Sequence, residues 1–177
     1  MITKVYMFDF DGTLFNSPRK PTWWQFKGWW SNPNSLSFPC IPKNPGNEWW
    51  NPSVVAAAKK AISDPQGTTV LCTGRIKHRF TEIVTSLVKD KGLKFDRLHF
   101  NPGDDTLPYK IGVIKRLKED YPFATEIAIY DDRHNHLEKM ADFAKEIGFD
   151  VVNPHPIREN SQEVSCTEDE YLQLQGT

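Results

Sequence analysis

The feature that most constrains this chain is a short apolar run that ends in carboxylates and a glycine. Val5–Phe8 is typical of a strand buried on both faces of a parallel sheet, and Asp9, Asp11 and Gly12 follow it. Ligands of open α/β sheets bind outside the carboxyl ends of the strands, so acidic chemistry is expected at this point. Extended backbone directs Asp9 and Asp11 to the same side, and a Mg²⁺ ion is the usual means of keeping two such carboxylates ionised.

The rest of the chain predicts strands that alternate with helices. Further strands are expected at residues 68–72, 97–100, 126–130 and 151–152. Helical spacing of apolar residues predicts helices that begin at Asn51-Pro52, near residue 77, at Lys110 and near residue 134. This alternation indicates an α/β fold with a parallel sheet and right-handed crossovers.

Polar residues follow three of these segments at positions where a site would form. Thr73-Gly74-Arg75 follows the second strand, Lys110 opens a helix, and Asp131-Asp132-Arg133 follows the fourth strand. Carboxylates from two strands can hold an octahedral Mg²⁺ and leave positions for water and a phosphate oxygen. The spacing leaves open which of Asp131 and Asp132 would contact the metal.

The sequence Asp-x-Asp-Gly-Thr-Leu after an apolar strand resembles the first motif of the haloacid dehalogenase (HAD) superfamily. Thr73, Lys110 and the pair Asp131-Asp132 resemble the second, third and fourth motifs in order. The resemblance implies a Rossmann-like three-layer sandwich of about five parallel strands in the order 5-4-1-2-3. The strands that carry Asp9 and Asp131 would be neighbours in it.

The same resemblance implies a Mg²⁺-dependent phosphatase with an aspartyl-phosphate intermediate. Asp9 would be the nucleophile, and Asp11 would be the acid and base for the leaving group and for water. Thr73 would bind the phosphate and Lys110 would neutralise it. The metal ligands would be Asp9, the Asp11 backbone carbonyl, and Asp131 or Asp132. Other candidates for substrate binding are Gly12, Thr13, Gly74 and Arg133.

Three further stretches resemble a narrower group. Asn51-Pro52, Gly74-Arg75 and 129–133 are similar to segments of the HAD domain of Swiss Army Knife RNA-repair-like proteins and of the 3′-phosphatase domain of polynucleotide kinase–phosphatases. This implies action on 3′-phosphate ends of RNA or DNA, with Arg75 and Arg19 gripping nucleic-acid phosphates. Two alternatives stay open: a phosphatase of a small metabolite or nucleotide, and a non-catalytic interaction module.

All six tryptophans lie between residues 16 and 51, in a proline-rich stretch that predicts an irregular cap inserted after the first strand. The pairs are Trp23-Trp24, Trp29-Trp30 and Trp49-Trp50. One interpretation is that they form the core of the cap, because Trp is highly buried on average. The other is that some of them stack on bases or a sugar, or form a surface for a protein partner.

Composition limits the partners and the domain organisation. A formal net charge of −1 gives no global electrostatic case for binding nucleic acid or a membrane, and no apolar run approaches a membrane span. Three widely spaced cysteines suggest neither a disulfide framework nor a zinc site, so an intracellular, cytoplasmic setting is expected. One catalytic domain at 1–156 is expected, with the cap at 16–51. A polar, acidic tail at 157–177 would be a short helix opened by Thr167 and Glu170 or a loose terminus.

Overall fold

The computed structural model describes residues 1–175, which form an α/β fold on one parallel sheet. Neighbouring strands run parallel in the order β3-β2-β1-β4-β5, which is the predicted order counted from the opposite edge. β1 is therefore central, between β2 and β4. The strands are β1 (Lys4–Phe8), β2 (Gly67–Ile76), β3 (Arg97–Asn101), β4 (Glu126–Asp131) and β5 (Val151–Pro156).

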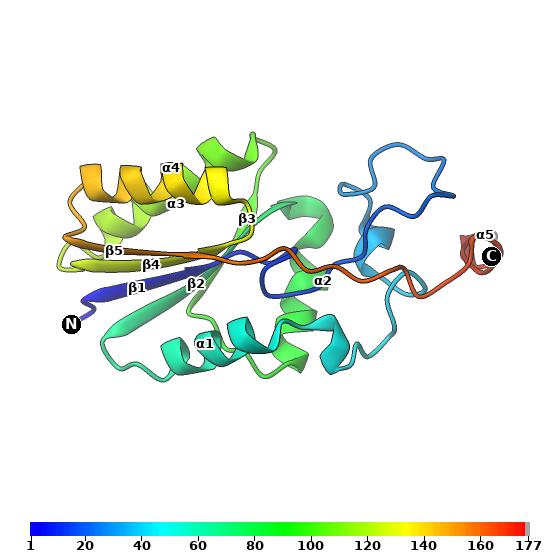
Figure 1. Ribbon diagram of the computed structural model, residues 1–177, viewed down its shortest axis with the longest axis horizontal. Coiled ribbons are helices and arrows are strands. Elements are labelled where there is room, and N and C mark those ends of the chain that lie inside the picture. Colours follow the sequence, from blue (N-terminus) through cyan, green and yellow to red (C-terminus); the bar gives the residue numbers. More distant parts are fainter. Residues whose placement is uncertain (176–177) are drawn as a thin grey trace.

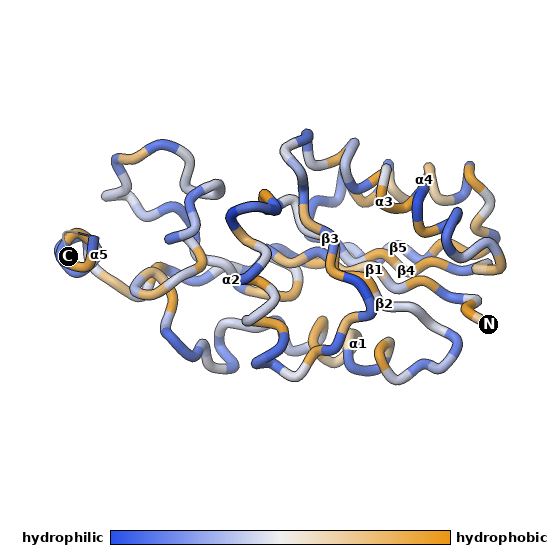
Figure 2. Tube along the Cα trace, turned by 180° about the vertical axis from the view of Figure 1, so that it is seen from behind, coloured by the Kyte–Doolittle hydropathy of each residue, from blue (hydrophilic) through white to orange (hydrophobic). Residues whose placement is uncertain are grey.

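Helices cover both faces of the sheet and complete a three-layer sandwich (Figure 1). Side chains alternate along β1, so Phe8 packs on the side of α1 and α2, while Val5 and Met7 pack on the side of α3 and α4. Apolar residues lie along the strands and also recur along the helices that cover them (Figure 2). Within residues 1–175, no helix has the length and apolar character needed to cross a membrane. The helices are α1 (Pro52–Ile62), α2 (Lys77–Asp90), α3 (Thr106–Asp120) and α4 (His134–Glu146).

The first residues of two helices test the predicted helix starts. Asn51 caps α1 as expected, because its side chain accepts from the backbone N–H of Ser53 and Val54. α3 begins at Thr106, so the prediction that this helix begins at Lys110 is wrong. Pro108 suggested a loop, but in the first turn of a helix its missing N–H costs no intrahelical bond.

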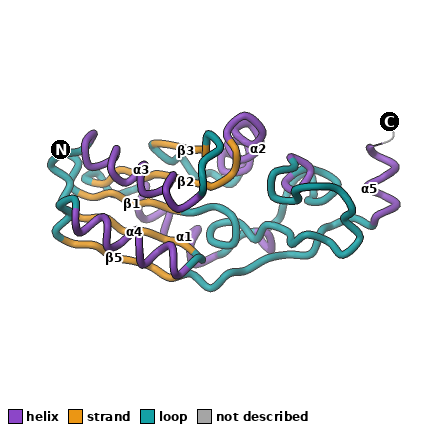
Figure 3. The backbone as a smooth tube through the Cα atoms, turned by 90° about the horizontal axis from the view of Figure 1, so that it is seen from above, coloured by secondary structure: helices purple, strands orange, loops and turns teal. Residues whose placement is uncertain are grey.

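The predicted cap lies beyond the carboxyl ends of the strands (Figures 1 and 3). Its regular structure, within the described residues, is two short 3₁₀ helices, Pro33–Leu36 and Asn47–Trp49. Trp49 and Trp50 pack into the main core against Phe15, and Trp24 and Trp29 form a separate cluster with Cys40. Two tryptophans are thus buried in a cluster of the cap, as the first interpretation predicted, but Trp49 and Trp50 belong to the main core and Trp30 is half exposed.

The C-terminal segment runs from β5 along the cap and ends in α5 (Glu168–Gln175), far from the sheet (Figures 1 and 3). Backbone N–H groups of Asn160, Gln162 and Ser165 donate to carbonyls of residues 12, 16 and 40. The predicted capping box opens α5, because Thr167 and Glu170 exchange hydrogen bonds. The short helix is therefore confirmed, and the loose terminus is wrong for residues up to 175.

Candidate active site

β1 delivers Asp9 to the carboxyl edge of the sheet. The Asp9 backbone N–H donates to the Tyr130 carbonyl of β4 at 3.0 Å, which continues the ladder one residue past the strand. One carboxylate oxygen accepts from Lys110 Nζ at 2.8 Å and the other lies 3.0 Å from Thr13 Oγ1. Both oxygens are thus oriented, and the Asp9 residue is only 8% exposed.

Lys110 joins the carboxylates that follow β1 and β4. Its ammonium lies 2.8 Å from Asp9 Oδ1 and 2.8 Å from Asp131 Oδ2, and the side chain is buried. Burial alone would lower the pKa of Lys110, but the charges of Asp9 and Asp131 outweigh that effect and raise it. Lys110 is therefore a permanent cation beside Asp9.

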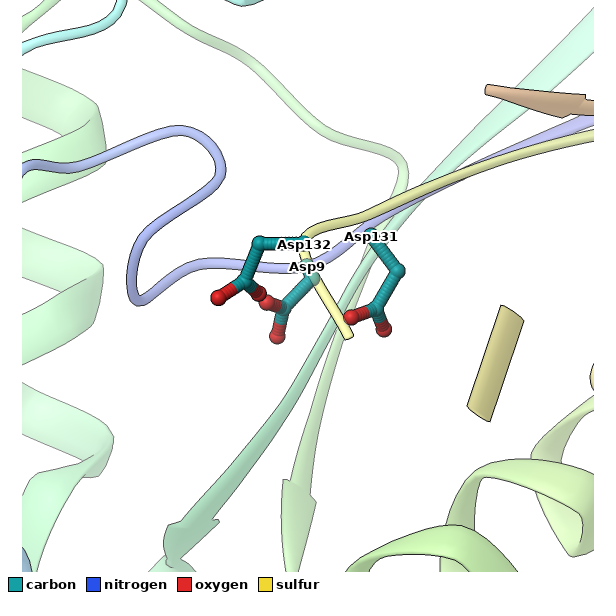
Figure 4. A group of neighbouring side chains, drawn as sticks. All are labelled: Asp9, Asp131 and Asp132. Atoms are coloured by element: carbon teal, nitrogen blue, oxygen red, sulfur yellow. The ribbon is translucent and has the colours of Figure 1, made fainter. Parts of the chain in front are cut away.

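Asp9, Asp131 and Asp132 form the acidic cluster of the site (Figure 4). One oxygen from each carboxylate lies within 4.8 Å of the others. Burial, followed by repulsion from the other two aspartates, raises the pKa of Asp9 although Lys110 opposes the shift. Three carboxylates and one ammonium leave a net charge of −2 when all are ionised, and the donors are oxygens only. A divalent cation such as Mg²⁺ fits this donor set and this charge.

Gly12 and Thr13 bring the carboxylates of the two strands together. Gly12 has φ +72°, and a Cβ there would lie 2.7 Å from Asp132 Oδ2, so any side chain would displace Asp132. The Thr13 hydroxyl lies 3.0 Å from Asp9 Oδ2 and 3.1 Å from Asp132 Oδ1. The Gly-Thr turn therefore serves the geometry of the acidic cluster.

Asp11 lies outside this cluster and is paired with Arg75. Two donors of the guanidinium, Nε and Nη2, lie 2.9 and 2.7 Å from the two Asp11 oxygens, and Ser17 adds a third hydrogen bond. Burial would raise the pKa of Asp11, but the charge and hydrogen bonds of Arg75 lower it. Asp11 is consequently held as a carboxylate.

Arg75 also connects Asp11 with the cap. Its Nη1 donates to the Trp30 carbonyl at 2.9 Å and to Ser35 Oγ at 2.7 Å. The guanidinium lies over the rings of Trp30 and Phe80, at 5.0 and 4.7 Å from their centroids. Arg75 is only 4% exposed, so its described partners occupy it before any phosphate arrives.

A pocket of about 560 Å³ opens beside Asp9, between the sheet edge, the cap and the C-terminal segment. Eight of the twelve predicted site residues line it: Asp9, Asp11, Gly12, Gly74, Arg75, Lys110, Asp132 and Arg133. Thr73 is buried behind it and its hydroxyl accepts from the Arg75 backbone N–H at 3.1 Å. Arg19 is not among the lining residues, but its Nε donates at 2.6 Å to Oγ of Ser161, which does line the pocket.

Other lining residues were not expected from the sequence. They come from the β3–α3 loop, from the C-terminal segment and from one tryptophan of the cap. The carboxylates Asp104 and Asp105 gave a signal only as an acidic pair before a helix, and nothing in the polar tail pointed to the site. The residues are Ser17, Trp30, Ser31, Ile76, Asn101, Gly103, Asp104, Asp105, Thr106, Glu159, Asn160 and Ser161.

Residues 12–175 match the family described as HAD domain family 1 in Swiss Army Knife RNA repair proteins. The chain belongs to this family. The match covers the cap, the acidic pair after β4 and the C-terminal segment, and it begins just after Asp9 and Asp11. The segment that follows β5 is thus part of the family's domain.

Individual proteins are similar to this chain as well. An uncharacterised protein of Saccharomyces cerevisiae is 24% identical to this chain over 176 residues. The match covers 80% of this chain and 37% of the yeast protein. The chain thus spans little more than a third of that relative. The HAD domain of the effector protein Lem4 from Legionella pneumophila has a TM-score of 0.55 and 14% identity, over 98% of this chain and 93% of that one. This likeness concerns the fold.

Proposed function

We propose that this protein is a divalent-metal-dependent phosphatase of phosphate monoesters and that Asp9 is its nucleophile. The observation that carries the proposal is the position of Asp9. It is oriented by Lys110 and Thr13, lies with Asp131 and Asp132 in one acidic cluster, and opens onto the pocket. Nucleophile, neutralising cation and donor set for a metal are thus present together.

The first half of the reaction forms a covalent intermediate on Asp9. A carboxylate oxygen of Asp9 bonds to phosphorus, and the bond from phosphorus to the leaving oxygen breaks. Lys110 stabilises the negative charge next to Asp9 throughout. A divalent cation held by Asp9, Asp131 and Asp132 would offset the charge on the phosphoryl oxygens.

The second half of the reaction is hydrolysis of the aspartyl-phosphate, and in this proposal Asp11 acts as the base. As a carboxylate it can take a proton from the attacking water, which releases inorganic phosphate and regenerates Asp9. In the first half Asp11 must instead give a proton to the leaving oxygen. The ion pair with Arg75 opposes that protonation, so we expect phosphate oxygens of the substrate to compete with Asp11 for the donors of Arg75.

The preferred substrate of this proposal is a 3′-phosphate end of a nucleic acid. The family match supports it, because the family is described by RNA repair proteins. The charge of the pocket lining favours a second candidate, a small phosphorylated metabolite or nucleotide. Six carboxylates but only three cations line the pocket, which disfavours a chain of further phosphates.

Release of phosphate from three substrate classes, with Mg²⁺ and with EDTA, tests both candidates. The classes are 3′-phosphorylated oligonucleotides, nucleoside monophosphates and sugar phosphates. Mg²⁺-dependent release from the oligonucleotides supports action on nucleic-acid ends, and release from the small molecules alone removes it. No release from any class would favour a non-catalytic interaction module.

A further inference from the structure

Trp30 differs from the other tryptophans in exposure and position. It is 50% exposed, whereas Trp24, Trp29, Trp49 and Trp50 are each at most 7% exposed. It is also the one tryptophan among the residues that line the pocket. Packing of the cap therefore does not account for the exposed half of this side chain.

The ring of Trp30 is fixed relative to the catalytic groups. Arg75 lies over the ring and also donates to the Trp30 carbonyl, so both ring and backbone are held by one buried side chain. The same guanidinium holds Asp11. On the next residue, the Ser31 carbonyl accepts from Arg79 of α2 at 3.0 Å. The aromatic surface of Trp30 is thus preorganised, and Arg75 contacts both this surface and Asp11, the proposed acid and base.

We propose that Trp30 is the platform on which the nucleobase of a nucleoside phosphate stacks while its phosphate reaches Asp9. This inference rests on the proposed phosphatase function and names the group next to the phosphate. Arg75 lies over the indole at 5.0 Å from the ring centroid, and Trp30 is still half exposed at the pocket, where a planar ring can stack on it. The pocket of about 560 Å³ has the size of a site for a ligand much larger than phosphate.

The polar lining favours a nucleobase over a plain phenyl ring. Asp104, Asp105 and the Thr106 hydroxyl line the same pocket. Thr106 lies beside Gly74, which directly precedes Arg75, the residue that holds Trp30. These side chains offer hydrogen-bond acceptors, which suit the N–H groups on the edge of a base. A phenyl ring has no such donors to satisfy.

The decisive experiment compares each enzyme on two substrates that differ only in the base. Adenosine 3′-monophosphate and the corresponding base-free ribose 3-phosphate are hydrolysed by wild type, Trp30→Ala, Trp30→Phe and Phe26→Ala. Phe26 is a matched control, because it is a cap aromatic that is also 50% exposed but does not line the pocket.

We expect the base to raise kcat/KM of the wild-type enzyme by about tenfold or more, mainly through KM. In Trp30→Ala the ratio of kcat/KM with the base to kcat/KM without it should fall to about one. Trp30→Phe and Phe26→Ala should retain most of the wild-type ratio. A ratio near one in the wild type, or a ratio that survives Trp30→Ala, overturns the proposal. So does a Trp30-dependent preference for a phosphotyrosine peptide over the nucleotide.

A binding measurement separates this inference from the proposed function. Quenching of tryptophan fluorescence by adenosine 3′-monophosphate reports stacking without turnover. If neither substrate is hydrolysed but quenching is lost in Trp30→Ala, the platform stands and the phosphatase does not. If quenching is unchanged in that variant, the platform is refuted. Oligonucleotides with the same 3′-terminal residue then show whether the natural ligand is a strand end or a free nucleotide. Affinity that rises with length indicates a strand end, and affinity that falls with length indicates a free nucleotide.

Discussion

Asp11 and Arg75 are 64 positions apart and are joined by two hydrogen bonds of 2.9 and 2.7 Å. Asp11 belongs to the turn after the central strand, and Arg75 belongs to β2, next to it in the sheet. Because Arg75 also binds the backbone and a hydroxyl of the cap, the pair joins the sheet edge, the cap and the proposed acid and base in one network.

Arg75→Gln should destabilise the protein by about 3 kcal/mol, because it leaves a largely buried carboxylate without its cation. Urea unfolding at pH 7 measures the change. The double variant Arg75→Gln/Asp11→Asn is the control, and it should recover a large part of the loss. If the double variant is as unstable as the single one, the loss comes from contacts of Arg75 with the cap.

The same pair makes a prediction for pH. The folded protein lowers the pKa of Asp11, so the pair contributes stability above the pKa that Asp11 has in the unfolded chain. That contribution is lost as the pH falls through the folded value. The difference in unfolding free energy between wild type and Arg75→Gln should therefore be full at pH 6 and shrink below about pH 4. A difference that stays constant down to pH 3 would contradict the assignment.

Asp9→Asn should reduce phosphatase turnover by at least roughly 10⁴-fold, because the nucleophile is removed. Rapid quenching with a ³²P-labelled substrate should trap acid-stable label on wild-type protein and none on the variant. Circular dichroism provides the control for folding. Substantial turnover by Asp9→Asn would exclude the covalent mechanism.

The acidic cluster predicts that Mg²⁺ stabilises the folded state. A cation at 100 times its dissociation constant adds about 2.7 kcal/mol to the free energy of unfolding. Asp132→Asn should weaken this gain and leave the contacts of Lys110 intact, since Lys110 contacts Asp9 and Asp131. Glu159→Gln, which lines the same pocket outside the cluster, should keep the gain. Equal Mg²⁺ responses of the two variants would place the cation elsewhere.

The strands and the edge of the sheet at which the site forms could be predicted from local signals, because apolar runs indicate buried strands and parallel strands bring the residues after them to one edge. The expectation that the strands of Asp9 and Asp131 are neighbours came from the resemblance to the HAD superfamily. The contact of Arg75 with the cap, through the Trp30 carbonyl and the Ser35 hydroxyl, could not be predicted in this way. It depends on how an irregular, proline-rich cap folds back on the sheet, and no periodicity encodes that path.

The C-terminal segment shows the same limit. Its polar composition is typical of a loose tail. Backbone hydrogen bonds nevertheless hold it along the cap, and any sequence can make such bonds. The one local signal that was informative was the capping box of Thr167 and Glu170. The start of α3 was missed for a related reason, because Pro108 is compatible with both a loop and a first helical turn.

Lys110→Met should destabilise the protein by about 3–5 kcal/mol in the absence of metal, because Asp9 and Asp131 lose a shared cation in a buried place. Lys115→Met is the matched control, since Lys115 is exposed on the same helix. That control should change stability by no more than about 0.5 kcal/mol. Equal effects of the two substitutions, measured by urea unfolding in EDTA, would show that Lys110 does not neutralise the cluster.

Tyr171→Ala tests whether α5 holds the cap together. Tyr171 is 3% exposed, packs on Trp23 and Trp24, and its hydroxyl accepts from Asn34 of the cap at 2.9 Å. Removing the ring should cost about 3 kcal/mol, and the cap should open before the sheet unfolds.

The measurements are tryptophan emission and limited proteolysis at urea concentrations below the main transition. Tyr171→Ala should show a red-shifted emission and early cleavage within residues 157–175, because the cap tryptophans become hydrated. Leu172→Ala is the neighbouring control, since Leu172 is 45% exposed and its truncation should change little. A cap that stays protected in Tyr171→Ala would mean that the backbone hydrogen bonds of the C-terminal segment suffice to hold it.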